Sequence, residues 1–361
     1  MSVARSCGDF SQSYVADRRL LRTPPQRVML GVLALVLIAY PSMTNGEWLR
    51  FGTVTATTLI AVVGLQLLVG LTGLVSVGQS AFMGVGAYFA GVAANSLHQS
   101  LPVCVVIGAV GSMMVGLAFG LPAARIKGFY LALTTLAAQY VFAFVIVRLP
   151  QQEFGGDAGL TMPTPSLFGL NLSSPWRLYY LTIALAIILV TAALFIQESV
   201  AGHLFVAVRD DDLAASMTGV AVTRYRVLAF GISALYAGVA GALLAYQDGF
   251  VNAQAFSVFD SVFFLGMIII GGMGTVLGAI LGTLMLSFIQ EAVNLWGGSV
   301  AGVFGYHLNG QTGPVVNIVT GLAICLMLIY EPRGLAFLYR RSESFFRLWP
   351  FPYALTRART T

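Results

Sequence analysis

The sequence contains a run of 74 residues, from Phe51 to Ala124, without a single lysine, arginine, aspartate or glutamate. A helix that crosses a bilayer needs about 20 apolar residues, so this run has room for three crossings. Of the 361 residues in the chain, 58% are hydrophobic and only 9% are charged. Soluble proteins carry about 25% charged residues and could not bury so much apolar surface. The sequence therefore predicts an all-α polytopic membrane protein.

Nine apolar stretches are candidates for membrane segments. They are 28–43, 52–72, 74–96, 101–122, 128–147, 178–196, 227–247, 256–290 and 314–330. Their orientation follows from the basic residues, because cytoplasmic loops are enriched in lysine and arginine. If the N-terminus is cytoplasmic and successive membrane segments cross in alternating directions, 16 of the 19 basic residues lie on the cytoplasmic side. The other three, Arg50, Arg148 and Arg177, lie at the outer edge. The net charge of +5 therefore indicates topology, and not nucleic-acid binding.

The stretch 256–290 makes an even number of crossings if the C-terminal tail, with its six arginines, is also cytoplasmic. Its uncharged part would reach about 45 Å as one helix, against roughly 60 Å for two full spans. We therefore expect either two short or tilted helices, broken at Gly271, Gly272 and Gly274, or a re-entrant hairpin. The total is about ten transmembrane or partly re-entrant helices.

The predicted organisation has a cytoplasmic tail at 1–27, a transmembrane domain at 28–330 and a second cytoplasmic tail at 331–361. Within the domain, 149–177 is an outer loop and 198–226 is a cytoplasmic loop. The three histidines and three cysteines are scattered along the chain, so no metal set is suggested. No paired catalytic residues are present, which speaks against an intramembrane enzyme.

The cytoplasmic loop 198–226 carries the most specific pattern. Asp212 is predicted to cap a short helix, because its carboxylate can accept hydrogen bonds from free N–H groups at a helix start. Small Ala214 and Ala215 would then present a smooth face to a partner's groove, and Gly219 suits the helix end. The alternative is a solvated loop whose arginines reach water.

Glycines and isolated polar residues inside the apolar stretches are candidates for a translocation path or for close helix packing. They are Gly78, Gln79, Gly84, Gly86, Tyr88, Gln139, Gly271, Gly272 and Gly274. Gln66 and Gln290 are further polar candidates. For each of them, an interhelical hydrogen bond or simple packing remains the alternative to a role in the path.

Several motifs together resemble the branched-chain amino-acid ABC transporter permease family of the LivM type. In chain order they are Gly73-Leu74 through Gly86-Ala87-Tyr88, Gly128-Phe129-Tyr130-Leu131, Gly155-Gly156 with Gly159-Leu160, Arg209-Asp210-Asp211-Asp212-Leu213-Ala214-Ala215 with Gly219, Gly271-Gly272-Met273-Gly274, and Pro332-Arg333-Gly334-Leu335. The resemblance covers roughly 50–338. The chain departs from the family pattern at Gln79, His203, Asp211 and Ser216.

The resemblance implies a non-enzymatic permease subunit of an ABC importer in the bacterial cytoplasmic (inner) membrane, with both termini cytoplasmic. Its partners would be a second permease, two cytoplasmic ATPase subunits and an extracytoplasmic solute-binding protein. The chain would bind no cofactor itself, since ATP and Mg belong to the ATPases. The residues expected to couple it to the ATPases are His203, Arg209, Asp210, Asp212, Ala214, Ala215 and Gly219.

Branched-chain or other hydrophobic amino acids are the substrates that the resemblance favours. Urea, short amides, and aromatic or other carboxylates are the alternatives within the family. A stand-alone secondary transporter or channel is the alternative from a different class. Against an ion-coupled carrier, every acidic residue between Arg50 and Glu331 falls in a loop or at the end of an apolar stretch.

Overall fold

A computed structural model describes residues 36–42, 44–126, 128–148, 150, 155–167, 170–171, 174–303, 313–330 and 334–338. The tail predicted at 1–27 lies outside the described residues, as does the tail at 331–361 except for 334–338. Of the first predicted membrane stretch, 28–43, the structure describes 36–42, which are helical.

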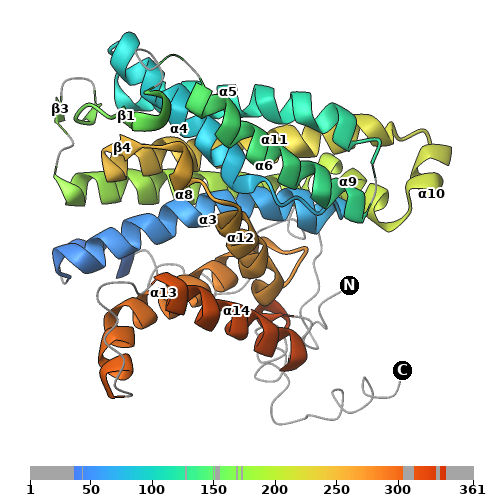
Figure 1. The fold of residues 1–361 in the computed structure, drawn as a ribbon. Coiled ribbons are helices and arrows are strands. Elements are labelled where there is room, and N and C mark those ends of the chain that lie inside the picture. Colours follow the sequence, from blue (N-terminus) through green and yellow to red (C-terminus); the bar gives the residue numbers. More distant parts are fainter. Residues whose placement is uncertain are drawn as a thin grey trace, which may run out of the picture.

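The described chain is built almost entirely of helices (Figure 1). The α-helices are α3 (Gly46–Thr72), α4 (Gln79–Ser96), α5 (Leu101–Ala123), α6 (Phe129–Arg148), α8 (Pro175–Glu198), α9 (Val200–Asp210), α10 (Asp212–Met217), α11 (Val222–Asp248), α12 (Val258–Gly271), α13 (Val276–Val303) and α14 (Gly313–Tyr330). In the described part, seven helical segments are long and apolar enough to cross a membrane. The predicted class, an all-α polytopic membrane protein, is confirmed.

The described part of 149–177, which the sequence analysis predicted to be an outer loop, contains short strands that the sequence did not predict. Strand β1 (Leu160–Thr161) pairs antiparallel with β4 (Phe250–Val251), which follows α11. Strands β2 (Ser166–Leu167) and β3 (Leu170–Asn171) pair with each other. The 3-10 helices η1 (Gly156–Ala158) and η2 (Ala253–Ala255) flank these strands. The β1–β4 pair fixes the outer loop onto the end of α11.

The core lies where α3, α4, α5 and α11 pack together, and these helices run side by side in Figure 1. Glycines let three of them touch backbone to backbone. A Cβ atom on Gly86 would lie 2.3 Å from the Cα of Gly238, and one on Gly238 would lie 2.7 Å from the carbonyl oxygen of Gly108. No side chain fits in this space, so close backbone packing replaces side-chain interdigitation.

Two helix boundaries refine the sequence analysis. The stretch predicted from residue 74 becomes helical only at Gln79, because Gly73 adopts a left-handed φ of 69° and ends α3. The predicted break within 256–290 is confirmed, since α12 ends at Gly271 and α13 begins at Val276. α12 has 14 residues, but α13 has 28 and is longer than expected because it continues to Val303.

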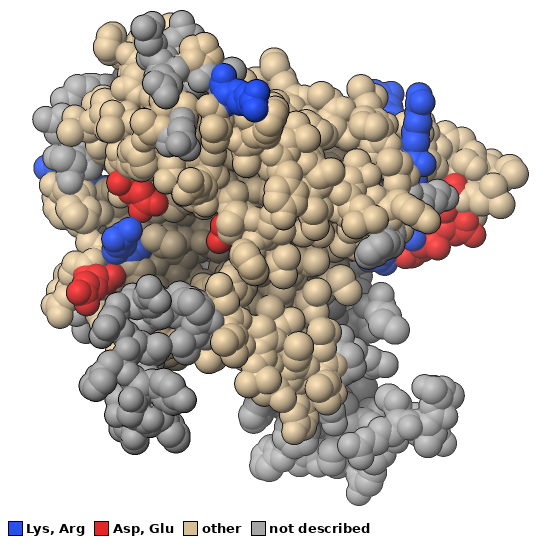
Figure 2. All heavy atoms as spheres, in the orientation of Figure 1, with Lys and Arg blue, Asp and Glu red and all other residues tan. Residues whose placement is uncertain are grey.

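The charged residues in the described chain lie mostly towards the two ends of the long helices, with a broad uncharged band between them (Figure 2). At one end, Arg50 at the start of α3 forms an ion pair with Asp248 at the end of α11, at 3.1 Å. Helices α9 and α10 lie at the opposite end (Figure 1). This distribution fits a bundle whose uncharged middle faces lipid.

Candidate functional site

The loop 198–226, for which the resemblance implies a coupling role and which we therefore call the coupling loop, folds into the two helices α9 and α10 and leads into α11. Ser199 caps α9, because its hydroxyl accepts a hydrogen bond from the N–H of Gly202 at 3.3 Å. The sequence analysis did not predict α9. The sequence does contain a helical pattern here, since the buried residues Gly202, Phe205 and Val208 recur every three residues along one face.

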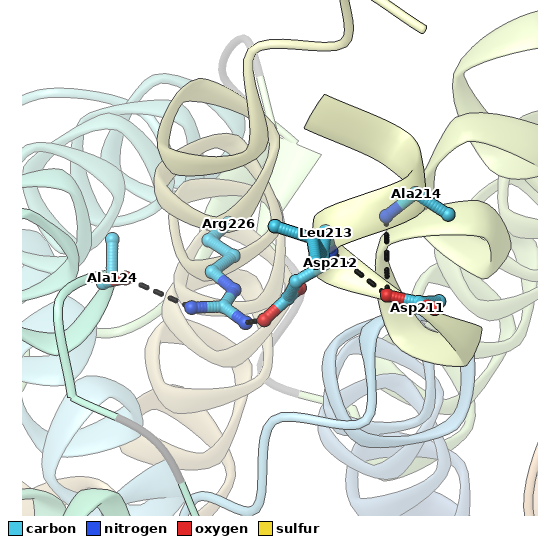
Figure 3. Close-up of polar contacts among 6 residues, drawn as sticks. All are labelled: Ala124, Asp211, Asp212, Leu213, Ala214 and Arg226. Atoms are coloured by element: carbon cyan, nitrogen blue, oxygen red, sulfur yellow. Dashed lines mark hydrogen bonds and ion pairs between the residues drawn. The ribbon is translucent and has the colours of Figure 1, made fainter. Parts of the chain in front are cut away.

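The N-cap of α10 is Asp211, and the prediction that Asp212 caps this helix is wrong. The Asp211 carboxylate accepts hydrogen bonds from the N–H groups of Leu213, at 2.9 Å, and Ala214, at 3.2 Å (Figure 3). Asp211 has an extended backbone, with φ −156° and ψ 109°, whereas Asp212 is already helical. Three consecutive aspartates could each have been the cap, and only the backbone turn selects one of them.

Asp212 instead forms a buried ion pair with Arg226 on the first turns of α11 (Figure 3). A second nitrogen of the same guanidinium donates to the carbonyl oxygen of Ala124, just after α5, at 3.1 Å. Only 6% of Arg226 is exposed. One side chain therefore ties α10, α11 and the end of α5 together. The sequence analysis treated Arg226 as a topology signal and missed this role.

The other end of α10 is closed as the sequence predicted. Gly219 has a left-handed φ of 86°. Its N–H donates to the carbonyl of Ser216 at 3.0 Å, and the N–H of Val220 donates to that of Ala215 at 3.1 Å. This pair of bonds is the Schellman motif, which needs a residue that tolerates positive φ.

The exposed face of α10 differs from the prediction. Ala215 is buried against the rest of the loop, so it cannot be part of a smooth outward surface with Ala214. Leu213 and Met217, one turn apart, are instead 68% and 80% exposed, and Ala214 is exposed between them. The outward face of α10 is therefore apolar and bulky, although it lies at the charged end of the bundle.

Asp211→Ala should destabilise α10 by about 1 kcal/mol, within the 0.5–2 kcal/mol range of N-cap losses, because two N–H groups lose their acceptor. Hydrogen exchange of the amides of Leu213 and Ala214 measures this directly, and both should exchange faster. Asp210→Ala is the matched control, since Asp210 is exposed and its carboxylate binds Arg209 rather than the first N–H groups of α10. Equal protection of both amides in the Asp211 variant would contradict the capping role.

Arg209 links α9 to the end of α3. Its Nη1 donates to the carbonyl oxygen of Gly70 at 2.9 Å, and its other nitrogens bind the Asp210 carboxylate. Gly73 leaves room for this side chain, because a Cβ there would lie 2.8 Å from Cγ of Arg209. His203 is exposed, and its Nδ1 lies 2.8 Å from the carbonyl oxygen of Ser199. Arg209 and Asp210 thus lie together, while His203 lies two turns earlier on α9.

The turn between α12 and α13 lies beside Arg209. Gln66 of α3 donates to the carbonyl oxygen of Thr275 at 3.1 Å. Gln197 of α8 donates to that of Gly274 and accepts from the N–H of Val276, both at 3.4 Å. These amides bind the backbone groups that the helix break leaves without helical partners. Gln197 was not among the predicted site residues, although it is a polar residue at the end of an apolar stretch.

The glycines of this turn serve close packing and unusual backbone geometry. A Cβ on Gly271 would lie 1.9 Å from the carbonyl oxygen of Gly278, so α12 and α13 are in backbone contact. Gly272 and Gly274 have φ values of 107° and 89°. Gly334 packs onto Gly272, since its Cβ position lies 2.5 Å from the Gly272 Cα. The segment 334–338 therefore begins at the same end of the bundle as the coupling loop.

A second polar centre surrounds the start of α4 inside the bundle. The N–H of Ala81 donates to Oε1 of Gln139 at 2.8 Å, and the N–H of Ser80 donates to the hydroxyl of Ser261 at 2.9 Å. Just before the helix, the N–H of Val77 donates to Thr135 at 3.0 Å. Side chains of α6 and α12 thus satisfy the first N–H groups of α4, which water cannot reach.

The predicted polar residues Gln79 and Gln139 both lie in this centre and are bonded. Gln79 donates to the carbonyl oxygens of Ala61 and Ser233 and accepts from the Ser233 hydroxyl. Gln139 also donates to the carbonyl oxygen of Phe256 at 2.7 Å. Gly78 precedes α4 and packs on Thr135. Gln290 is half-buried on α13, away from these bonds.

Gly84, Gly86 and Tyr88 follow along α4. Gly84 lies beneath the ring of Phe142, and Gly86 lies against Gly238. Tyr88 is buried. The predicted residues therefore form three groups: the coupling loop, the α12–α13 turn beside it, and the start of α4 with the residues beyond. Among the described residues, no group of three histidine, cysteine, aspartate or glutamate side chains is placed to hold a metal ion.

Comparison with known proteins identifies transport permeases. The family described as branched-chain amino acid transport system / permease component matches residues 48–329. The high-affinity branched-chain amino acid transport system permease protein LivM of Salmonella typhimurium is 27% identical over 337 residues, which cover 87% of this chain and 75% of that protein.

Two further relatives are permeases whose names do not mention branched-chain amino acids. The probable ABC transporter permease protein y4mJ of Sinorhizobium fredii is 30% identical, covering 76% of this chain and 84% of that protein. The autoinducer 2 import system permease protein LsrC of an Enterobacter species is also 30% identical, covering 79% of this chain and 85% of that protein. No solved structure matches this chain.

Proposed function

This chain belongs to the branched-chain amino acid transport system permease family, and from that premise we propose that it is the transmembrane subunit of an ATP-binding-cassette importer. Its cargo is a branched-chain or other hydrophobic amino acid, as the names of the LivM relatives suggest. The subunit lies in the bacterial inner membrane with both termini in the cytoplasm. The domain at 28–330 forms the translocation path together with a second permease of the same type.

The partners follow from the same proposal. Two cytoplasmic ATPase subunits bind ATP and Mg and supply the energy, and an extracytoplasmic binding protein delivers the solute to the side that bears the 149–177 loop. This chain itself binds no cofactor and performs no hydrolysis. It receives the energy through contacts with the ATPases.

The observation that carries this proposal is the apolar face of α10. Leu213 and Met217 are more than two thirds exposed. They lie at the charged end of the bundle, on the helix that directly follows the exposed Asp210 and Asp211 in the chain. Two exposed apolar side chains on a short, doubly capped helix in an aqueous region fit a protein partner's groove better than they fit solvent.

The contacts that α9 and α10 make with the membrane helices can transmit a movement of the partner to those helices. α10 is fixed to α11 and α5 through Asp212 and Arg226. α9 is fixed to the end of α3 through Arg209. A displacement of α9 and α10 by the ATPases would therefore move α3, α5 and α11 together. It would shift the equilibrium of the path between inward-open and outward-open states.

The geometry favours this reading over an ion-coupled secondary transporter. Every aspartate and glutamate whose exposure the structure describes is at least partly exposed. The buried polar side chains in the described chain are threonines, serines, glutamines and Arg226. A carrier driven by protons or sodium uses carboxylates inside the membrane. Permeases for urea, short amides or other carboxylates stay as alternatives within the family.

The Leu213→Ser/Met217→Ser double variant tests the proposal. It should reduce co-purification with the cognate ATPase, and ATPase stimulation by loaded binding protein in proteoliposomes, at least tenfold, while the membrane helices stay folded. Ser216→Ala is the matched control on the same helix, because its exposed hydroxyl bonds only the carbonyl of Leu213. Normal stimulation in the double variant would show that α10 is not the docking surface.

Uptake assays identify the cargo. Complexes loaded with labelled leucine, isoleucine or valine should accumulate them in an ATP-dependent manner, and urea should not compete. Wild-type complexes that take up urea or an aromatic carboxylate but none of the three amino acids would replace the proposed substrate with one of the family alternatives.

A further inference from the structure

The hydroxyl group of Tyr88 is buried in the membrane part of α4 without a hydrogen-bond partner among the described residues. Only 2% of the residue is exposed. A buried hydroxyl without a partner costs stability, because it loses its bonds to water and gains none in return. By contrast, Tyr236 is equally buried, and its hydroxyl donates to the carbonyl oxygen of Leu189 at 2.9 Å. The unpaired hydroxyl of Tyr88 therefore requires an explanation.

Phe142 packs against Tyr88, and Phe256 packs against Phe142. The rings of Tyr88 and Phe142 meet edge to face with centroids 6.3 Å apart, and Phe142 meets Phe256 in the same way at 6.3 Å. We call these three residues the aromatic cluster. Gly84 allows it to form, since a Cβ there would lie 2.3 Å from the Phe142 ring and 3.0 Å from that of Phe256. Both rings can therefore rest against the backbone of α4.

The cluster sits on the outer half of α4. That helix starts in the interior, where Gln79 bonds α3 and α11 near their middles, and it ends beside the outer loop, where Asn95 donates to the carbonyl oxygen of Thr161 at 2.9 Å. Tyr88 lies nine residues beyond Gln79, about 13 Å along the helix. The aromatic cluster is thus on the side from which a solute would enter in an importer.

The two phenylalanines come from elements held to α4 by the Gln139 amide. Gln139 lies on the same face of α6 as Phe142, one turn earlier. It donates to the backbone of Phe256 and accepts from that of Ala81. The opposite face of α6 is exposed. If these bonds open, both rings move away from α4 together and leave the Tyr88 hydroxyl accessible.

We propose that Tyr88 is a specificity-determining residue of the translocation path. Its hydroxyl hydrogen-bonds the polar group of the passing solute, while Phe142 and Phe256 contact the solute's apolar side chain and close over Tyr88 when the path is empty. This inference rests on the proposed function. It assigns the site to a small solute that combines an apolar side chain with a carboxylate or ammonium group, and it gives a bonding role to a buried hydroxyl that has no partner among the described residues.

Tyr88→Phe separates this role from a structural one, because it removes only the unpaired hydroxyl. The variant should unfold at the same temperature as the wild type or higher. In proteoliposomes with binding protein and ATPase, its KM for leucine uptake should rise about tenfold, which corresponds to about 1.4 kcal/mol of lost binding. Tyr236→Phe is the matched control. It removes the hydrogen bond from the Tyr236 hydroxyl to the carbonyl oxygen of Leu189, so its unfolding temperature should fall while its KM stays unchanged.

A second variant tests the closure. Gly84→Ala places a methyl group under the rings of Phe142 and Phe256, and it should increase the ATP-independent leak of leucine from loaded vesicles. An unchanged KM in Tyr88→Phe, or a lower unfolding temperature with no change in uptake, would overturn the inference and leave the proposed function intact. Wild-type complexes that take up none of leucine, isoleucine and valine would overturn both the inference and the proposed substrate.

Discussion

Arg226→Ala should destabilise the protein by about 3 kcal/mol, the lower end of the cost of removing one partner from a buried ion pair, because the Asp212 side chain stays 19% exposed. The variant leaves the Asp212 carboxylate without its guanidinium, and it leaves the carbonyl oxygen of Ala124 without its donor. α10 should then separate from α11 and from the end of α5. Thermal unfolding of the purified protein in detergent measures the loss, and co-purification with the ATPase should fall in parallel.

Two variants check the assignment to the ion pair. Arg224→Ala removes an exposed arginine from the same turn of α11 and should change stability by less than about 0.5 kcal/mol. Asp212→Ala added to Arg226→Ala removes both members of the ion pair, so the loss in the double variant should be smaller than the sum of the two single losses. Additive losses in the double variant would show that the two side chains act independently.

Gly241→Ala should cost about 3 kcal/mol or more, because the methyl group has no space. Its Cβ would lie 1.8 Å from the carbonyl oxygen of Met83 and 3.1 Å from the N–H nitrogen of Ala87, and both belong to the backbone of α4. A side chain could rotate away, but a helix backbone cannot. α4 and α11 would have to separate, and the yield of folded protein in membranes should drop sharply.

Gly321→Ala in α14 is the matched control for this prediction. Among the described residues, no atom outside its own stretch of helix lies within 4 Å of its Cβ position, so the added methyl group meets no obstacle there. Alanine is a better helix former than glycine by roughly 1 kcal/mol, and this variant should be neutral or slightly more stable. Wild-type yield and unfolding temperature in Gly241→Ala would mean that α4 and α11 are not in backbone contact.

The class of the protein and most of its helices could be predicted from the sequence, because lipid imposes a simple rule. Long uncharged stretches must form helices that bond all their own backbone groups. The run from Phe51 to Ala124 became α3, α4 and α5. The break at Gly271–Gly274 and the helix end at Gly219 were equally readable, because glycine tolerates backbone angles that other residues do not. The family resemblance rested on these same local motifs.

Pairing between distant residues was not readable in this way. Asp212 was taken for a helix cap, but the fold brings Arg226 to it and makes Asp211 the cap. Ala215 was expected to face outward, whereas the position of α9 buries it and turns Leu213 and Met217 to the surface. Which face of a six-residue helix is exposed depends on what packs behind it, and its own sequence does not contain that information.

The sequence by itself determined that this is a polytopic membrane permease, where its helices run, and where glycines end or interrupt them. The membrane class, the helices and their breaks follow from hydropathy, charge and backbone freedom, which act over a few neighbouring residues, whereas the permease role was implied by the family resemblance. Only the tertiary structure decided that Gln139 joins α4 to Phe256, that Gln197 holds the α12–α13 turn, and that the hydroxyl of Tyr88 is left unpaired. Those outcomes depend on which helices become neighbours. The hydrogen-bond partners of a buried polar group can lie tens of residues, or more than a hundred residues, away in the chain, so the local sequence does not reveal them.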